Sequence, residues 1–171
     1  MVEIGTPDGG TLHMADGITH LPPARARAFL GLVRAGETLA RELDAELRAL
    51  HGISLRGFEV LLFLAVFAPE GRLRVSELAE RAPLSQSRVS RLVAELEGLG
   101  LVRRSTAEGD ARGVEVTITK AGMEKFSQAG ETHLRGLEAR LFSHLSEEEI
   151  EQLAGITGRI LEACGVRRMQ A

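Results

Sequence analysis

The sequence predicts a mainly α-helical protein with one small β-wing. Two short amphipathic patterns, separated by Pro83, lie near the middle of the chain, and a stretch of alternating apolar residues follows them directly. Longer helical patterns lie on both sides of this central region. A helix, a tight turn, a second helix and a hairpin in this order are typical of a winged helix-turn-helix domain, here flanked by long N- and C-terminal helices.

The first central helix should begin near Val75 and end before Pro83. Val75, Leu78 and Ala79 recur at the spacing of one helical face. Proline removes a backbone donor and disfavours helix at the residue before it, so the chain should turn there. Ser85 then occupies the position of an N-cap, where its hydroxyl can accept a backbone N–H of the following helix.

The second central helix should carry one apolar face and one polar face. With about 100° of rotation per residue, the apolar face gathers Val89, Leu92, Val93 and Leu96. The polar face is small, hydroxylated and basic in its first half. Such a face suits a DNA major groove, where arginine can pair with guanine and glutamine with adenine. The candidate base-reading residues are Ser85, Gln86, Ser87, Arg88, Ser90 and Arg91. The alternative interpretation is the solvated face of an ordinary core helix.

A change from helical to alternating periodicity marks a hairpin after this helix. Residues 102–105 are expected to form one strand, and residues 107–113 a loop rich in turn-forming residues. The alternation of apolar and polar residues from Val114 to Ile118 predicts the second strand. Residues 73–75 are candidates for a third strand.

Four charged residues of the hairpin are candidates for DNA contact. We expect Arg112, near the tip, to enter a minor groove, where narrow A·T segments concentrate negative potential. Arg103 or Arg104 would hold phosphates. Asp110 would repel phosphates if left free, so we expect it to hold the loop or to orient an arginine.

Four segments of the chain together resemble one known family. They are Leu78-Ala79-Glu80, the helix from Ser85 that ends in LEGLGLV, the loop EGDARG with its Asp-x-Arg, and the closing TITKAG. Over about residues 53–122 the chain resembles the multiple antibiotic resistance regulator (MarR) family. The resemblance implies a homodimer whose N- and C-terminal helices interlock and hold two winged domains apart.

The same resemblance implies a small phenolic or anionic effector, bound between the dimer helices and the winged lobe. Residues that would lie near this crevice are Phe29, Arg34, His51, Phe58 and Leu62. A stripe of Phe and Leu is usually ordinary core, so these residues are not predicted as site residues.

From the residues and the resemblance we expect a sequence-specific double-stranded DNA-binding transcription regulator, most simply a repressor. It would act as a homodimer on an inverted repeat with half-sites about 34 Å apart. The charge permits this function without demanding it, because residues 72–120 carry nine basic and seven acidic residues, and the remainder twelve and seventeen. The acidic remainder slightly favours the alternative, a winged-helix protein-interaction module without DNA binding.

These patterns divide the chain into four parts. Residues 1–23, rich in Gly, Pro, Thr and Asp, predict a flexible arm, and residues 24–52 an N-terminal dimerisation helix. Residues 53–119 are expected to form the winged helix-turn-helix DNA-binding domain, and residues 120–171 the C-terminal dimerisation helices.

Three further helices should begin at caps. The expected helices are one from Ser54 to about Phe67, one from Thr119 to about Leu145, and one from a Ser146 capping box to about Cys164.

Composition excludes several classes of protein. The single cysteine, Cys164, rules out an internal disulfide framework and fits a reducing cytoplasm, and we expect a bystander thiol there. The longest apolar run, residues 60–68, is too short to cross a membrane, and no secretory signal is evident. None of the common catalytic or phosphate-binding motifs occurs, and the five histidines are scattered. We therefore predict a cytoplasmic protein with no enzyme activity, metal or cofactor.

Overall fold

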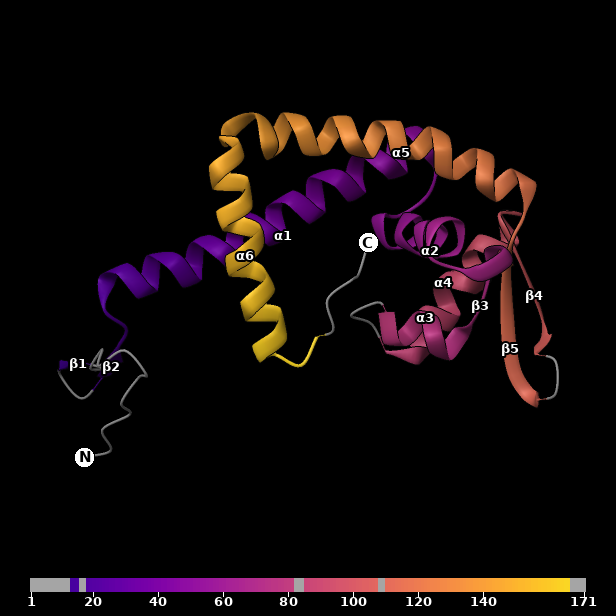
Figure 1. The fold of residues 1–171 in the computed structure, drawn as a ribbon, viewed down its shortest axis with the longest axis horizontal. Coiled ribbons are helices and arrows are strands. Elements are labelled where there is room, and N and C mark those ends of the chain that lie inside the picture. The colour runs from indigo at the N-terminus through magenta and orange to yellow at the C-terminus, as the bar shows by residue number, and fades with distance from the viewer. Residues whose placement is uncertain (1–12, 16–17, 82–84, 108–109, 167–171) are drawn as a thin grey trace. The chain divides into compact units, whose positions relative to one another are not determined.

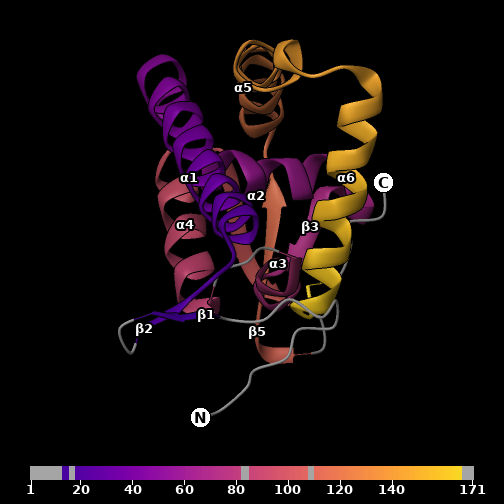
Figure 2. The ribbon, with the colours of Figure 1, turned by 90° about the vertical axis from the view of Figure 1, so that its left-hand side faces the viewer.

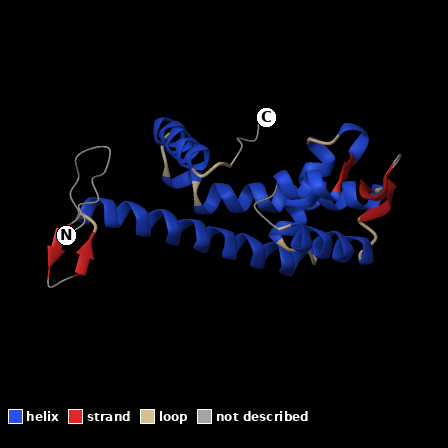
Figure 3. Cartoon of the chain, turned by 90° about the horizontal axis from the view of Figure 1, so that it is seen from below, coloured by secondary structure: helices blue, strands red, loops and turns tan. Residues whose placement is uncertain are grey.

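The computed structural model describes residues 13–15, 18–81, 85–107 and 110–166; the side chains of residues 13–20, 69, 107 and 110–112 lie outside that description. Helices make up most of the described chain (Figure 3). The chain divides into two compact units, residues 1–42 and residues 43–171.

The first unit contains a short hairpin and the first part of a long helix. Strands β1 (His13–Ala15) and β2 (Ile18–His20) pair antiparallel, with His13 opposite His20. The arm expected over residues 1–23 therefore includes a hairpin that the periodicity did not predict. The sequence between the strands is Asp-Gly, a pair that favours two-residue hairpin turns.

The long helix α1 (Pro23–His51) continues from the first unit into the second. It is 29 residues long and ends where the sequence predicts, with Gly52 following at a positive φ of 70°. Its first half carries apolar side chains that are 38–58% exposed. These are Phe29, Leu30, Leu32 and Val33.

The centre of the second unit is helix α2 (Leu55–Val66). In Figures 1 and 2 it lies beneath α5 (Lys120–Arg140) and above α3 (Val75–Arg81) and α4 (Gln86–Gly98). Most of its residues are buried, as the apolar composition of every face predicts. This helix therefore forms the core on which the two central helices rest.

Three predicted helix starts are confirmed by their caps. The hydroxyls of Ser54 and Thr119 each accept a backbone N–H three residues further on, at 3.0 Å. Ser146 and Glu149 form the predicted capping box at the start of α6 (Glu147–Ala163). Each cap depends only on residues close in sequence, which is why the sequence could predict it.

Helix α5 ends earlier than the prediction of about Leu145. The regular helix stops at Arg140, and Leu141 departs from helical geometry with φ −130° and ψ −67°. A 3₁₀ turn, η2 (Phe142–His144), follows it. Apolar spacing does not distinguish 3.6 from 3.0 residues per turn over a single turn, so the sequence overestimates the length of α5.

The wing is a three-stranded antiparallel sheet in the order β3-β5-β4 (Figure 1). The strands are β3 (Arg72–Arg74), β4 (Val102–Ala107) and β5 (Asp110–Ile118). The third strand is confirmed, one residue earlier than predicted, but the loop expected over residues 107–113 is wrong. Ala107 belongs to β4 and residues 110–113 to β5, and Ala107 pairs with Asp110 after a register shift between Thr106 and Ala107. Such a shift lets turn-forming residues stay paired in a hairpin.

No single helix of the described chain is long and apolar enough to cross a membrane; only α1 and α2 taken together, bent by 79° at their junction, meet that test of length and composition.

Candidate nucleic-acid interface

Helix α4 is anchored by three buried side chains, those of Val89, Val93 and Leu96. Leu92 is half-buried beside them. Apart from Ser85, which precedes the helix, the residues predicted to read bases all lie on its remaining, exposed side. They are Gln86, Ser87, Arg88, Ser90 and Arg91. The predicted separation of an apolar and a polar face is confirmed.

The start of α4 departs from the prediction in one detail. Ser85 has the extended backbone of an N-cap, but its side chain caps no backbone N–H. Its hydroxyl lies 3.1 Å from the hydroxyl of Ser87 instead. The predicted cap position is therefore right and the predicted hydrogen bond wrong, because a neighbouring hydroxyl competes for the same group. Both hydroxyls remain exposed at the end of the helix.

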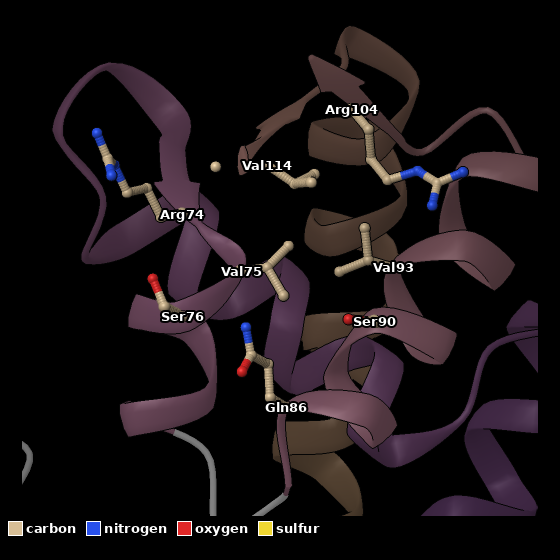
Figure 4. A pocket seen from close by; sticks show the side chains of 9 residues that line it. Arg74, Val75, Ser76, Gln86, Ser90, Val93, Arg104 and Val114 are labelled. Carbon is tan, nitrogen blue, oxygen red and sulfur yellow. The ribbon is translucent and has the colours of Figure 1, made fainter. Parts of the chain in front are cut away.

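A hollow of about 300 Å³ separates the first half of α4 from the wing (Figure 4). Ser90 and Val93 of α4 form one side, and the start of α3 forms the other. The full lining is Arg74, Val75, Ser76, Gln86, Ser90, Val93, Arg104, Gly113 and Val114. Arg74 and Ser76 were not predicted as part of this surface, since their place depends on where β3 joins the sheet.

Arg104 is tied to α4 by the carboxylate of Glu97. One carboxylate oxygen of Glu97 accepts the Arg104 backbone N–H at 2.9 Å, and the other lies 2.6 Å from Nε and 2.5 Å from Nη2 of Arg104. The hydrogen bonds from the Arg104 side chain and backbone lower the pKa of Glu97. Glu97 was not among the predicted site residues.

Arg103 and Arg104, treated as alternatives in the sequence, occupy different faces of β4. Side chains alternate along a strand, so Arg103 lies on the opposite face from Arg104, which meets α4. Arg103 is exposed and, like Arg88 and Arg91, makes no ion pair or side-chain hydrogen bond with the described residues. Three arginines thus keep their hydrogen-bonding capacity for a partner.

Asp110 and Arg112 lie on β5, where Asp110 pairs with Ala107 of β4. Their side chains are outside the described part of the structure. The minor-groove role of Arg112 and the loop-holding role of Asp110 stay predictions.

Two histidines lie at contacts with α5 within the second unit, His51 at the end of α1 and His133 on α5 itself, facing Phe58 of α2. His51 Nε2 is 2.8 Å from the hydroxyl of the buried Thr132. Burial, with smaller effects of Lys125 and Arg135, lowers the pKa of His51. The ring of His133 lies 4.8 Å from that of Phe58, and its buried Nδ1 has no hydrogen-bond partner among the described residues.

Burial also lowers the pKa of His133, against a smaller opposite effect of Glu59. Phe58 itself is only 4% exposed and stacks on Phe126, so it belongs to the core, as its apolar neighbours suggested.

Comparison with known proteins connects this geometry to one family. The family model of the MarR family matches residues 51–113. The HTH-type transcriptional repressor MdtR of Bacillus subtilis (strain 168) is 35% identical over 105 residues, which cover 60% of this chain and 66% of that repressor. The structure of Sco3205, a MarR family transcriptional regulator from Streptomyces coelicolor in complex with DNA, is 29% identical with a TM-score of 0.80, over 87% of this chain and 92% of that chain. The chain belongs to the MarR family.

The resemblance stated from the sequence and the winged-helix fold are both confirmed. A further relative, the HTH-type transcriptional regulator PecS of Dickeya dadantii (strain 3937), is 27% identical over 75% of this chain and 76% of that protein. The family match contains every candidate DNA-contact residue from Ser85 to Arg112. The MarR-family transcription regulator therefore carries its candidate interface within the part of the chain that defines the family.

Proposed function

We propose that this MarR-family regulator represses transcription by binding double-stranded DNA sequence-specifically, as a homodimer on an inverted repeat. The observation that carries the proposal is the exposed face of α4, which presents two serines, a glutamine and two arginines that form no ion pair with the described residues, beside the wing. In this arrangement α4 enters a major groove and the wing follows the flanking backbone. The DNA complex of the relative Sco3205 supports this use of the fold.

Residue roles follow from the chemistry of each side chain. Arg88 and Arg91 suit guanine edges, because a guanidinium donates two parallel hydrogen bonds, and Gln86 suits adenine. Arg103 suits a backbone phosphate on the outer face of the wing. Arg112 remains the proposed minor-groove residue.

A second copy of the chain is the proposed partner of the terminal helices. No residue of α6 is buried, yet four large apolar side chains on it are 36–47% exposed, those of Leu153, Ile156, Ile160 and Leu161. The first half of α1 exposes a comparable apolar surface. Burying these exposed apolar side chains against an identical chain would remove them from water and stabilise a dimer.

A small phenolic or anionic effector that releases the DNA completes the proposal. Its support is a group of polar atoms on and beside α5, namely the paired His51 and Thr132 and the buried Nδ1 of His133, which has no hydrogen-bond partner among the described residues. A screen of phenols and aromatic carboxylates for DNA release, with thermal shift of the DNA-free protein as a second readout, tests this part separately.

The central experiment is a retardation assay with the promoter region upstream of the protein's own gene. Specific binding that resists competitor DNA is expected from the wild-type chain. Arg91→Ala should reduce the preference for the operator by about 1–3 kcal/mol for the base pair it contacts. Arg27→Ala, which removes an exposed arginine from α1, should leave that preference unchanged.

The wing contact is tested in the same assay as a function of salt. Arg112→Ala should weaken binding and lower the salt dependence by about one counterion; if it changes neither, the wing contact is wrong. If the wild-type chain shows no binding to DNA at any salt concentration, the result would instead support the alternative, a winged-helix protein-interaction module.

A further inference from the structure

Glu97 places a negative charge at the very surface proposed to meet DNA. Its carboxylate receives three contacts from Arg104, one from the backbone N–H and two from the guanidinium. The side chains are 32% and 44% exposed. Ion pairs with this exposure contribute little to stability, so stability alone does not account for such a complete arrangement.

The arrangement fixes the guanidinium relative to α4. Nε and Nη2 of Arg104 both lie against one oxygen of the Glu97 carboxylate, and these two contacts restrict the orientation of the planar group. The third contact holds the backbone of β4 to the same carboxylate, seven residues away in sequence. Because Glu97 lies in the last turns of α4, one carboxylate joins the candidate reading helix to the base of the wing.

Arg104 keeps binding capacity in this orientation. A guanidinium has five N–H groups, and Glu97 uses those on Nε and Nη2. The stem of Arg104 lines the hollow near Val93 and Val114 (Figure 4), and its guanidinium extends beyond the hollow to Glu97. A phosphate oxygen of a DNA strand that passes between α4 and the wing would meet the remaining N–H groups there.

We propose that Glu97 is a positioning residue for DNA binding, which holds Arg104 ready to contact a backbone phosphate between α4 and the wing. This inference rests on the proposed function. It predicts an effect opposite in sign to simple electrostatics. Removing a negative charge from a DNA-facing surface ordinarily strengthens binding, whereas removing the charge of Glu97 weakens it because Arg104 loses its fixed orientation.

Glu95→Gln is the matched control for Glu97→Gln. Both glutamates lie on α4, and both substitutions remove one negative charge with almost no change of shape. Within the described residues Glu95 makes no hydrogen bond or ion pair, whereas Glu97 holds Arg104. Any difference between the two variants therefore reports on the contact with Arg104.

The test is an anisotropy titration of the full chain with the duplex used in the retardation assay, repeated at several salt concentrations. Glu97→Gln should weaken binding about tenfold, the loss typical of a charge-assisted hydrogen bond, and lower the salt dependence by about one counterion. Glu95→Gln should bind as tightly as the wild type or more tightly, with an unchanged salt dependence.

A double-mutant cycle separates positioning from general damage. Arg104→Ala should weaken binding at least as much as Glu97→Gln, and adding Glu97→Gln to Arg104→Ala should weaken it no further. Arg104→Lys, which keeps the charge but loses the planar fork, should also bind less tightly. Thermal midpoints of all variants within a few degrees of the wild type show that folding is intact.

Two outcomes would overturn the inference, and they are distinguishable. If the wild-type chain binds the operator and Glu97→Gln binds as tightly as Glu95→Gln, Glu97 does not position Arg104 and the proposed function stands. If the wild-type chain shows no specific DNA binding, the proposed function fails and this inference fails with it.

Discussion

Replacing Gly122 with alanine tests the close approach between the start of α5 and the backbone of Leu101. A Cβ at this position would lie 2.0 Å from the carbonyl oxygen of Leu101 and 2.9 Å from Cγ1 of Ile118. The carbonyl oxygen has no side-chain rotation by which to move aside, and it also accepts the Thr119 N–H at 3.0 Å. The start of α5 would therefore have to move away from the loop that precedes β4.

The expected magnitude is the balance of opposing effects. Alanine favours an interior helix position over glycine by about 1 kcal/mol. Overpacking a well-filled site costs about 1–3 kcal/mol, and a shift of α5 would also weaken the Thr119 cap, whose loss costs about 1 kcal/mol. We expect a net loss of about 2 kcal/mol, which for a chain of this size lowers the thermal midpoint by about 4–8 °C.

Thermal and urea unfolding followed by circular dichroism measure this loss. Gly130→Ala is the control, because it makes the same change within α5 at a position where nothing lies within 4 Å of the added Cβ. That variant should gain up to about 1 kcal/mol from helix propensity. Equal stability of the Gly122→Ala and Gly130→Ala variants would refute the argument from close approach.

Three further predictions concern a cap, the histidines and the dimer. Ser54→Ala should lower the free energy of unfolding by about 1–2 kcal/mol, because the buried hydroxyl caps α2. Ser85→Ala should lower it by less than about 0.5 kcal/mol, because that hydroxyl caps no backbone N–H. Urea midpoints that fall equally for the two variants would contradict this. Burial lowers the folded-state pKa of both His51 and His133, so only the unfolded chain readily takes up their protons. The free energy of unfolding should be highest above the unfolded-state pKa of about 6.5 and fall as the pH drops below it. Urea titrations at pH 7.5 and 5.5 measure this loss, which should be smaller in a His133→Gln variant because glutamine stays neutral. Ile156→Glu should convert dimers to monomers in light scattering of the full chain, and an unchanged mass would exclude α6 from the interface.

Much of the fold could be predicted because it depends on residues close in sequence. The polar and apolar faces of α4 follow from the helical repeat alone, and the structure has Val89, Val93 and Leu96 buried as expected. The caps at Ser54 and Ser146 involve partners only three residues away. The same locality explains why the candidate base-reading residues could be named before their surroundings were known.

Errors arose where one residue has two possible partners, even when both are close in sequence. Ser85 was expected to cap α4, but its hydroxyl pairs with Ser87. Strands β4 and β5 include residues that favour turns, and Ala107 pairs with Asp110 across a shifted register. Neither outcome can be read from the preference of a residue taken alone.

The sequence by itself determined the family, the order of the helices and the side of α4 that faces outward, since periodicity and local capping are properties of short segments. Tertiary structure decided which of two adjacent arginines meets α4, that Arg74 and Ser76 join the same hollow, and that Glu97 lies against Arg104. Those contacts form only when the sheet is assembled against α4. Alternation along a strand decides which face of the sheet a side chain occupies, but only the pairing of β3, β4 and β5 brings one of those faces against the helix.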